Sequence, residues 1–129
     1  MGGRAWTHEE DALLVFFASI PVASKHIVSL LAFKGFPRTE SAVRCRAQFI
    51  REREKLGRSW FWNINMVNQW LDGQILQHGI EHFFVATPQE QNYMAHNQPD
   101  IHLSQYYDFL NLRIMAIRQQ IVEMSEGFY

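Results

Sequence analysis

The sequence is poor in cysteine and has no long apolar run. Its single cysteine, Cys45, excludes an intramolecular disulfide. The longest apolar stretch, from Ala12 to Ile20, is far shorter than the roughly 18 residues that a membrane-spanning helix needs. The N-terminus has neither the basic region nor the cleavage site of a secretory signal, and the chain has no Asn-x-Ser/Thr acceptor. We therefore expect an intracellular protein, in the cytosol or nucleus, without membrane contact.

The chain also lacks the residue patterns of known active sites. It has no Gly-rich phosphate loop and no Ser, His and Asp order with supporting motifs. His78 and His82 are four residues apart, but Gly79 stands where the zinc-protease motif has glutamate, and it weakens a helix there. We therefore expect no enzyme, no metal, no cofactor and no small-molecule substrate.

The residues that are present suit a folded protein with two differently charged halves. Apolar residues make up 47% of the 129 residues, which is enough for a core. Residues 1–58 contain ten Lys or Arg and six Asp or Glu. Residues 59–129 contain two Lys or Arg and seven Asp or Glu. This asymmetry suggests two surfaces with different partners, although chance alone would also produce it.

The first half of the chain has the start and stop signals of three helices. Thr7 and Glu10 form a capping box, and Thr39 is a second N-cap candidate. Pro21, Gly35 and Gly57 are the expected breaks. The expected helices cover residues 8–20, residues 22 or 24 to 33, and residues 40 to about 56.

The second half has further helix signals and one ambiguous segment. Ser59 is an N-cap candidate for a helix over residues 60–72, which Asp72-Gly73 closes or bends. Residues 74–86 are apolar, and their periodicity fits a helix or a strand. The capping box of Thr87 and Glu90, with Pro88 at the first position, predicts the start of a short helix. The apolar side chains of the first of these helices repeat at Trp60, Ile64, Val67 and Leu71.

The clearest pattern lies at the C-terminal end. Apolar residues there are spaced alternately four and three apart over three heptads, which predicts a long amphipathic helix. The apolar stripe either packs on the rest of the chain or forms the seam of a homodimer or hetero-oligomer, and the sequence leaves both alternatives open. The seam consists of Leu103, Tyr107, Leu110, Ile114, Ile117, Ile121 and Met124.

Two segments of the first half resemble a known family. Trp6-Thr7-His8-Glu9-Glu10-Asp11 resembles the opening of a Myb/SANT repeat, and Arg38-Thr39 through Arg46 resembles the start of its third helix. The resemblance covers about residues 4–57, and the Trp-rich segment 60–72 is similar to a helix that follows the domain in some fungal Myb-like proteins. It implies an all-α fold, with a three-helix, homeodomain-like helix-turn-helix domain at 4–57 and a helical extension at 58–129.

The resemblance also implies a function and a set of contact residues. In DNA-binding members the third helix enters the major groove, where arginines pair with guanine and neighbouring cations neutralise phosphates. The acids of the first helix are expected to face solvent, and one of them to pair with a basic residue of the third helix. We therefore expect a nuclear protein that binds double-stranded DNA or chromatin, through Arg38, Ser41, Arg44, Arg46, Arg51, Arg53 and Lys55.

Departures from the family pattern keep a second interpretation open. Only the first of the three usual core tryptophans is present, since Ala47 stands at the position of the third. The third helix has five basic residues and three acids, an intermediate charge. SANT domains share the fold but commonly bind histone tails or partner proteins, so the alternative is a protein-interaction subunit of a nuclear complex with little DNA affinity. The expected partner interface is Trp60, Trp62, Tyr107, Leu110, Ile114, Ile117 and Ile121.

Overall fold

The computed structural model describes residues 5–20, 22–59, 61–98 and 101. This part of the chain is mostly helical, in agreement with the expected all-α class, and contains one short antiparallel hairpin. The C-terminal seam lies outside the described residues. The elements are α1 (His8–Ser19), α2 (Ser24–Phe33), α3 (Glu40–Arg53), β1 (Gly57–Arg58), β2 (Phe61–Trp62), α4 (Ile64–His78), the 3-10 helix η1 (Glu81–Phe84) and α5 (Pro88–His96).

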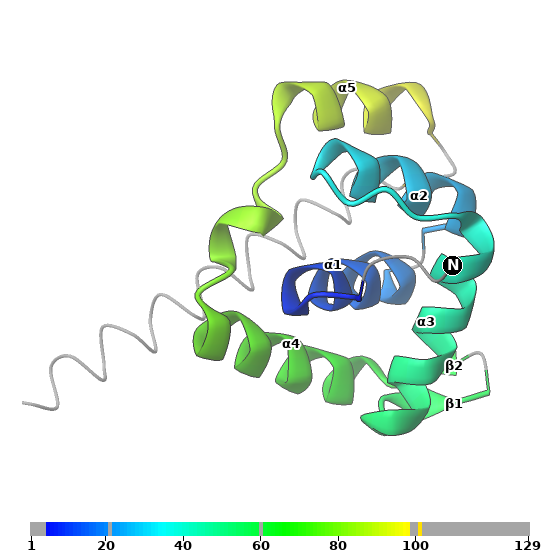
Figure 1. Ribbon diagram of the computed structural model, residues 1–129, viewed down its shortest axis with the longest axis vertical. Coiled ribbons are helices and arrows are strands. Elements are labelled where there is room, and N and C mark those ends of the chain that lie inside the picture. The colour runs from blue at the N-terminus through cyan, green and yellow to red at the C-terminus, as the bar shows by residue number, and fades with distance from the viewer. Residues whose placement is uncertain (1–4, 21, 60, 99–100, 102–129) are drawn as a thin grey trace, which may run out of the picture.

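Helix α1 is the centre of the core. Every residue from Ala12 to Phe17 is at most 1% exposed, so this helix is buried on all sides and not along one stripe. Figure 1 shows α2, α3 and α4 arranged around it. The 3-10 helix adds Phe84, whose ring meets that of Phe16 edge-on at 5.3 Å between centroids. Four later elements are therefore needed to cover the first helix.

The N-terminal caps are formed largely as predicted. The Thr7 hydroxyl accepts a hydrogen bond from the Glu10 amide, and the Glu10 carboxylate accepts one from the Thr7 amide, both at 3.2 Å. Thr87 likewise accepts a hydrogen bond from the Glu90 amide at the start of α5. The second half of that capping box is not formed, because the Glu90 carboxylate pairs instead with Lys34 of α2 at 3.0 Å.

Helix α3 ends three residues earlier than predicted. The amide of Leu56 donates to the carbonyl of Arg51, and that of Lys55 to Glu52, which is a Schellman ending. Lys55 occupies the left-handed position, with φ 57°, where glycine is usual. Leu56 is 1% exposed, so its burial stabilises the turn. The glycine expected at the helix end, Gly57, lies two residues beyond Lys55.

The segment after α3 is a hairpin and not the start of a helix, so the predicted N-cap at Ser59 is wrong. Gly57 pairs with Trp62 and Arg58 with Phe61, while Ser59 lies in the turn with φ 53°. Helix α4 starts later, where the Asn63 side chain accepts a hydrogen bond from the Met66 amide. The strands can pair this closely because Gly57 has no Cβ.

Helix α4 also runs through the predicted stop at Asp72-Gly73. It continues to His78 and ends at Gly79, which has φ 62°. A glycine inside a helix costs only about 1 kcal/mol, and burial of Leu71 and Ile75 against the core outweighs that cost. The ambiguous segment 74–86 is thus helical over most of its length.

The described residues in the second half of the chain pack on the first half. Helix α4 lies along α1, and α5 lies against α2 (Figure 1). Across the second contact, the Nδ1 atom of His26 is 2.9 Å from the hydroxyl of Tyr93, and Met94 is fully buried. Residues 64–96 therefore share one core with α1 and α2.

The hairpin generates a prediction about two glycines. A Cβ at Gly57 would lie 1.9 Å from the Phe61 carbonyl oxygen, whereas a Cβ at Gly73 meets nothing within 4 Å. We expect Gly57→Ala to lower the free energy of unfolding by about 2 kcal/mol, because the strands must separate. The control Gly73→Ala should raise it by up to about 1 kcal/mol. Urea denaturation measures both, and a Gly57→Ala variant as stable as wild type would contradict the hairpin.

Candidate nucleic-acid interface

The seven residues predicted to contact nucleic acid do not form one surface. Five lie on α3, Arg38 lies just before it, and Lys55 lies in the turn after it. The structure engages three of the arginines inside the protein and leaves the remaining residues exposed. The engaged residues are Arg38, Arg46 and Arg51, and the exposed ones are Ser41, Arg44, Arg53 and Lys55.

Arg38 is held by the start of α1. Its Nε and Nη2 atoms donate to the two carboxylate oxygens of Glu10 at 2.6 and 2.9 Å, and Nη2 also donates to the Ala5 carbonyl. The guanidinium lies 4.4 Å from the centroid of the Trp6 ring. Both charged side chains are nearly buried, at 7% and 2% exposure, so this pair joins the first helix to the third.

Arg46 makes a second such connection. Its guanidinium donates two hydrogen bonds to the carboxylate of Asp11, at 2.9 and 2.8 Å. The expectation that one first-helix acid pairs with a basic residue of the third helix is confirmed. The expectation that these acids face solvent is wrong for Glu10 and Asp11, which are 2% and 6% exposed. Each carboxylate needs its paired arginine, because a buried carboxylate without a cation would destabilise the folded state.

The ion pairs shift the pKa values of Glu10, Arg38 and Arg46. Burial raises the pKa of Glu10, but the hydrogen bonds from Arg38 and from the Thr7 amide outweigh burial, so the pKa lies below its ordinary value. The hydrogen bonds to Glu10 and Asp11 raise the pKa of Arg38 and of Arg46, respectively. All of these groups stay charged at neutral pH.

Arg51 points into the protein and not into solvent. It is 8% exposed, and its guanidinium lies 4.9 Å from the centroid of the Trp62 ring. Its Nε is buried without a hydrogen-bond partner, and burial lowers the pKa of this arginine. The cation–π contact with Trp62 stabilises the Arg51 charge less than hydrogen bonds to a carboxylate would.

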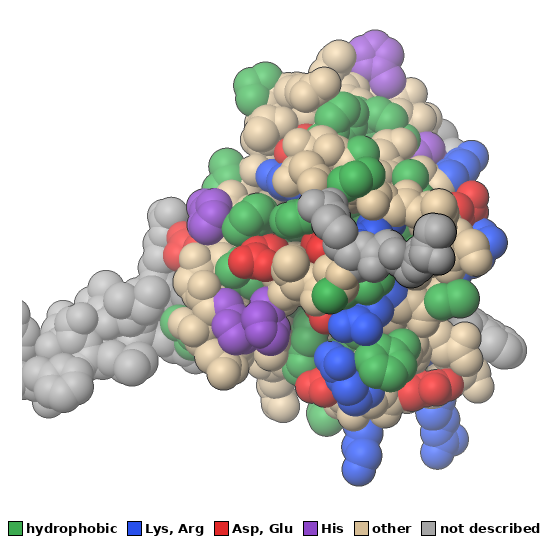
Figure 2. Space-filling model, in the orientation of Figure 1, with side chains coloured by type: hydrophobic (Ala, Val, Ile, Leu, Met, Phe, Trp, Pro, Cys, Tyr) green, Lys and Arg blue, Asp and Glu red, His purple; other side chains and the backbone are tan. Residues whose placement is uncertain are grey.

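The remaining cations are exposed along α3 and just beyond its end. Arg44 pairs with Glu40 at 2.7 Å and Arg53 with Glu54 at 3.1 Å, and both arginines are about half exposed. Lys55 and Arg58 are also exposed. Figure 2 shows Lys and Arg side chains gathered where α3 ends and the hairpin begins. We call Arg44, Arg53, Lys55 and Arg58 the basic surface.

Exposed aromatic rings stand beside these cations. Phe49 is 47% exposed, and the guanidiniums of Arg46 and Arg53 lie 4.9 and 5.0 Å from its centroid. Phe61, on the hairpin, is 66% exposed. Sequence reasoning missed Arg58 and Phe61 because Ser59-Trp60 was interpreted as a helix start, and only Gly57 hinted at a close backbone approach.

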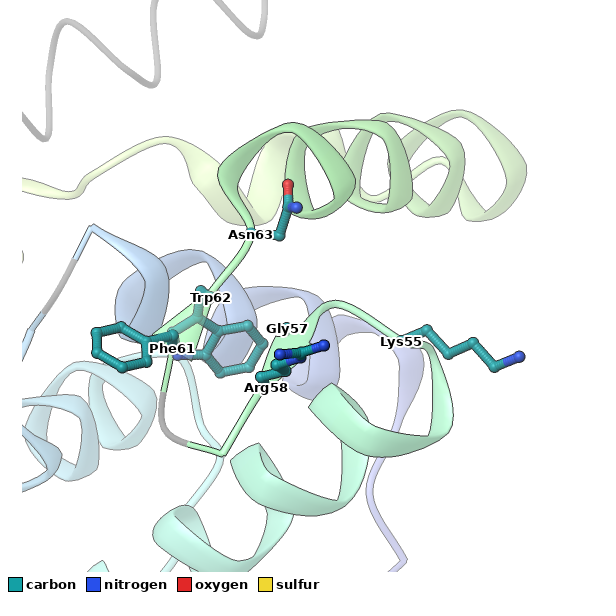
Figure 3. Close-up of a pocket in the computed structure, with 6 residues that line it drawn as sticks. All are labelled: Lys55, Gly57, Arg58, Phe61, Trp62 and Asn63. Atoms are coloured by element: carbon teal, nitrogen blue, oxygen red, sulfur yellow. The ribbon is translucent and has the colours of Figure 1, made fainter.

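The hairpin borders an open pocket of about 420 Å³. It is lined by Lys55, Gly57, Arg58, Phe61, Trp62 and Asn63, and Figure 3 shows Lys55 extending away from the other lining side chains. Polar and apolar groups both contribute to its walls, so the hollow suits contact with a polar polymer such as nucleic acid.

The predicted partner interface is only partly visible. Trp62 is half-buried between the hairpin and Arg51. The other predicted interface residues lie outside the part of the chain that the structure describes: Trp60, Tyr107, Leu110, Ile114, Ile117 and Ile121.

The histidines and the cysteine do not assemble into a site. Within the described ranges, no group of three or more His, Cys, Asp or Glu side chains is placed to hold a metal ion. The His78 ring stacks on that of His8 at 3.8 Å, and Cys45 is exposed on α3. Among the described helices, none is both long and apolar enough to span a membrane.

Comparison of the chain with protein-family models, with curated proteins and with solved structures finds no match.

The buried acid–arginine pairs generate a stability prediction. We expect Glu10→Gln to lower the free energy of unfolding by about 3 kcal/mol, because it leaves the buried Arg38 charge uncompensated. The control Glu40→Gln removes an acid from the exposed pair with Arg44 and should change stability by less than about 0.5 kcal/mol. Urea denaturation at neutral pH measures both.

The Glu10→Gln variant also tests the direction in which the pKa of Glu10 is shifted. The pKa of Glu10 is lower in the folded state than in the unfolded state. Its contribution to the free energy of unfolding is therefore complete above the unfolded-state pKa, and it is lost as the pH falls through the folded-state pKa. Acidification through this window should therefore destabilise wild type more steeply than Glu10→Gln. Equal slopes in the two proteins would contradict the assignment.

Proposed function

We propose that this chain is a nuclear DNA-binding protein whose residues 4–57 form a Myb/SANT-like helix-turn-helix domain. Three observations support the proposal. The first helix starts with the Thr7 capping box of the Myb/SANT opening. Two of its acids bind Arg38 and Arg46, at the start and in the first half of α3. Three helices occur in the expected order within this segment.

The observation that carries the proposal is the basic surface. Arg44, Arg53, Lys55 and Arg58 are exposed along α3 and the turn and strand that follow it. The acids that pair with Arg44 and Arg53 are themselves partly exposed, and such surface pairs contribute only about 0–1 kcal/mol. DNA phosphates can therefore replace these acids at little cost.

The positions of the cations suggest a division of roles. Ser41 and Arg44 lie in the first half of α3, where a helix in the major groove presents side chains to base edges. Arg53, Lys55 and Arg58 lie beyond its middle and suit phosphate contacts, which position a protein without reading the sequence. Arg38 and Arg46 then hold α3 on α1 and do not touch DNA.

The proposal predicts salt-dependent binding to duplex DNA. With up to three phosphate contacts, from Arg53, Lys55 and Arg58, log K should fall with log salt at a slope of roughly −3. Arg44→Gln or Arg53→Gln should weaken binding, and loss of one phosphate contact should reduce the slope by about 1. Fluorescence polarisation with a labelled random duplex at several salt concentrations measures both quantities.

A matched control separates local contact from net charge. Gln89→Glu, at an exposed position of α5, changes the net charge by the same amount as Arg44→Gln but lies far from α3 (Figure 1). It should leave affinity and slope nearly unchanged. If both variants weaken binding equally, α3 is not the contact element, and absence of binding at low salt would contradict the proposal.

A SANT-like protein-interaction subunit is the second candidate function. The observation in its favour is that Glu40, Glu52 and Glu54 lie among the cations, next to the half-exposed Phe49. A mixed, aromatic surface of this kind suits a basic histone-tail peptide. Binding of such a peptide that Glu52→Lys abolishes, with no DNA binding at low salt, would favour this function over the first.

A further inference from the structure

A second pocket, of about 340 Å³, lies between the end of α1, the start of α2 and one face of α3. Helix α3 contributes Arg44, Ala47, Gln48 and Arg51, which recur at helical spacing along a single stripe. The pocket is separate from the hollow beside the hairpin, although Trp62 borders both. Its volume is at the lower end of the range for small-molecule sites, roughly 300–1,000 Å³.

The floor of the pocket is apolar and belongs to the core. Leu14 is fully buried, and Ile27 and Val43 are at most 2% exposed. Ala18 and Ala47 are small and half-buried, so they leave room above these residues. An apolar group in this space would extend the core and be removed from water.

Arg51 is a buried charged residue in the lining of this pocket. It is 8% exposed and forms no hydrogen bond or ion pair with any residue that the structure describes. Among the described residues, the Trp62 ring faces its charge, with the guanidinium carbon 4.9 Å from the ring centroid. A buried guanidinium normally pairs with an anion, because desolvation disfavours the unpaired charge. Burial also lowers the pKa of Arg51, which has the same physical cause.

The start of α2 adds to the positive potential at the same place. Its N-cap is Ala23, which has no side-chain hydrogen-bond acceptor, and its first turn contains no acid. Ala23 and Ser24 both line the pocket. The positive end of the helix dipole therefore faces the same space as Arg51.

We propose that this pocket binds a small carboxylic acid with an apolar body. The carboxylate accepts hydrogen bonds from the planar guanidinium of Arg51, near the start of α2, and the apolar body lies on Ala18 and Ala47, above the buried Leu14. A monoanion matches the single buried cation. A free phosphate would leave most of the apolar lining uncovered and would need more donors. This site is independent of DNA binding, although Arg44 borders both the pocket and the basic surface.

The experiment compares octanoate with octanamide, a neutral molecule of nearly the same shape. Both are titrated into the full chain while NMR follows the Arg51 Nε–H group and the Ala47 methyl group. We expect saturable shifts of both signals with octanoate, and at least about tenfold weaker binding of octanamide, because the charge-assisted hydrogen bonds are absent. The NMR readout does not involve DNA, so its failure is distinguishable from failure of the proposed function.

Three variants sharpen the test. Arg51→Met should weaken octanoate binding by about tenfold or more, yet leave the melting temperature unchanged or raised, because an unpaired buried charge is removed. Ala47→Leu should also block binding, by filling the space, and serves if Arg51→Met does not fold. Arg53→Met, an exposed change on the same helix outside the pocket, should bind octanoate like wild type.

Several results would overturn the proposal. One is the absence of a saturable shift of the Arg51 signal when octanoate is added. Another is an equal affinity for octanoate and octanamide. A third is an octanoate affinity of Arg51→Met that equals that of wild type. Inorganic phosphate that binds as tightly as octanoate would show a simple anion site, and would equally overturn the assignment of an apolar acid.

Discussion

The structure depends on the complete burial of α1. A helix that is apolar on all sides cannot lie at a surface, so every face of it needs a covering element. Helices α2 and α3 cover part of it, and α4 and η1 cover further faces. This requirement explains why α4, beyond the segment that resembles a Myb/SANT domain, packs on the first helix. The expected helical extension is therefore, over α4, part of the same core.

Two buried ion pairs set the orientation of α3 on this central helix. Glu10 and Asp11 stand side by side in the first turn of α1, and their arginines come from the start and the first half of α3. Hydrogen bonds between charged groups are strong and directional, which favours one arrangement of the two helices. The same pairs engage the guanidiniums of Arg38 and Arg46, whose side chains are 7% and 22% exposed. The number of arginines in a helix is therefore a poor measure of its capacity to bind nucleic acid.

Arg51 illustrates a different use of a charged side chain. Its helix turns it toward the pocket, whereas Arg53, two residues further on, lies in solvent. In the sequence these arginines are equivalent, since both stand in one basic helix. The direction of each follows from the rotation of α3 about its axis, which the burial of Val43 and Ile50 fixes.

The sequence by itself determined the features that depend on neighbouring residues. The caps at Thr7, Thr39 and Thr87 are local hydrogen bonds, so their residue types predicted where α1, α3 and α5 begin. The helical class followed from apolar periodicity in the same way. Local signals misled at Ser59, where the chain forms a hairpin with Gly57 opposite Trp62, and at Gly73, where packing on α1 carries α4 further. The tertiary structure alone decided the hairpin, the passage of α4 through Gly73, and which arginines meet an acid, an aromatic ring or water. The course of α4 and the partners of Arg38 and Arg46 depend on contacts between distant segments, whose free energies exceed the local preferences that a sequence pattern records.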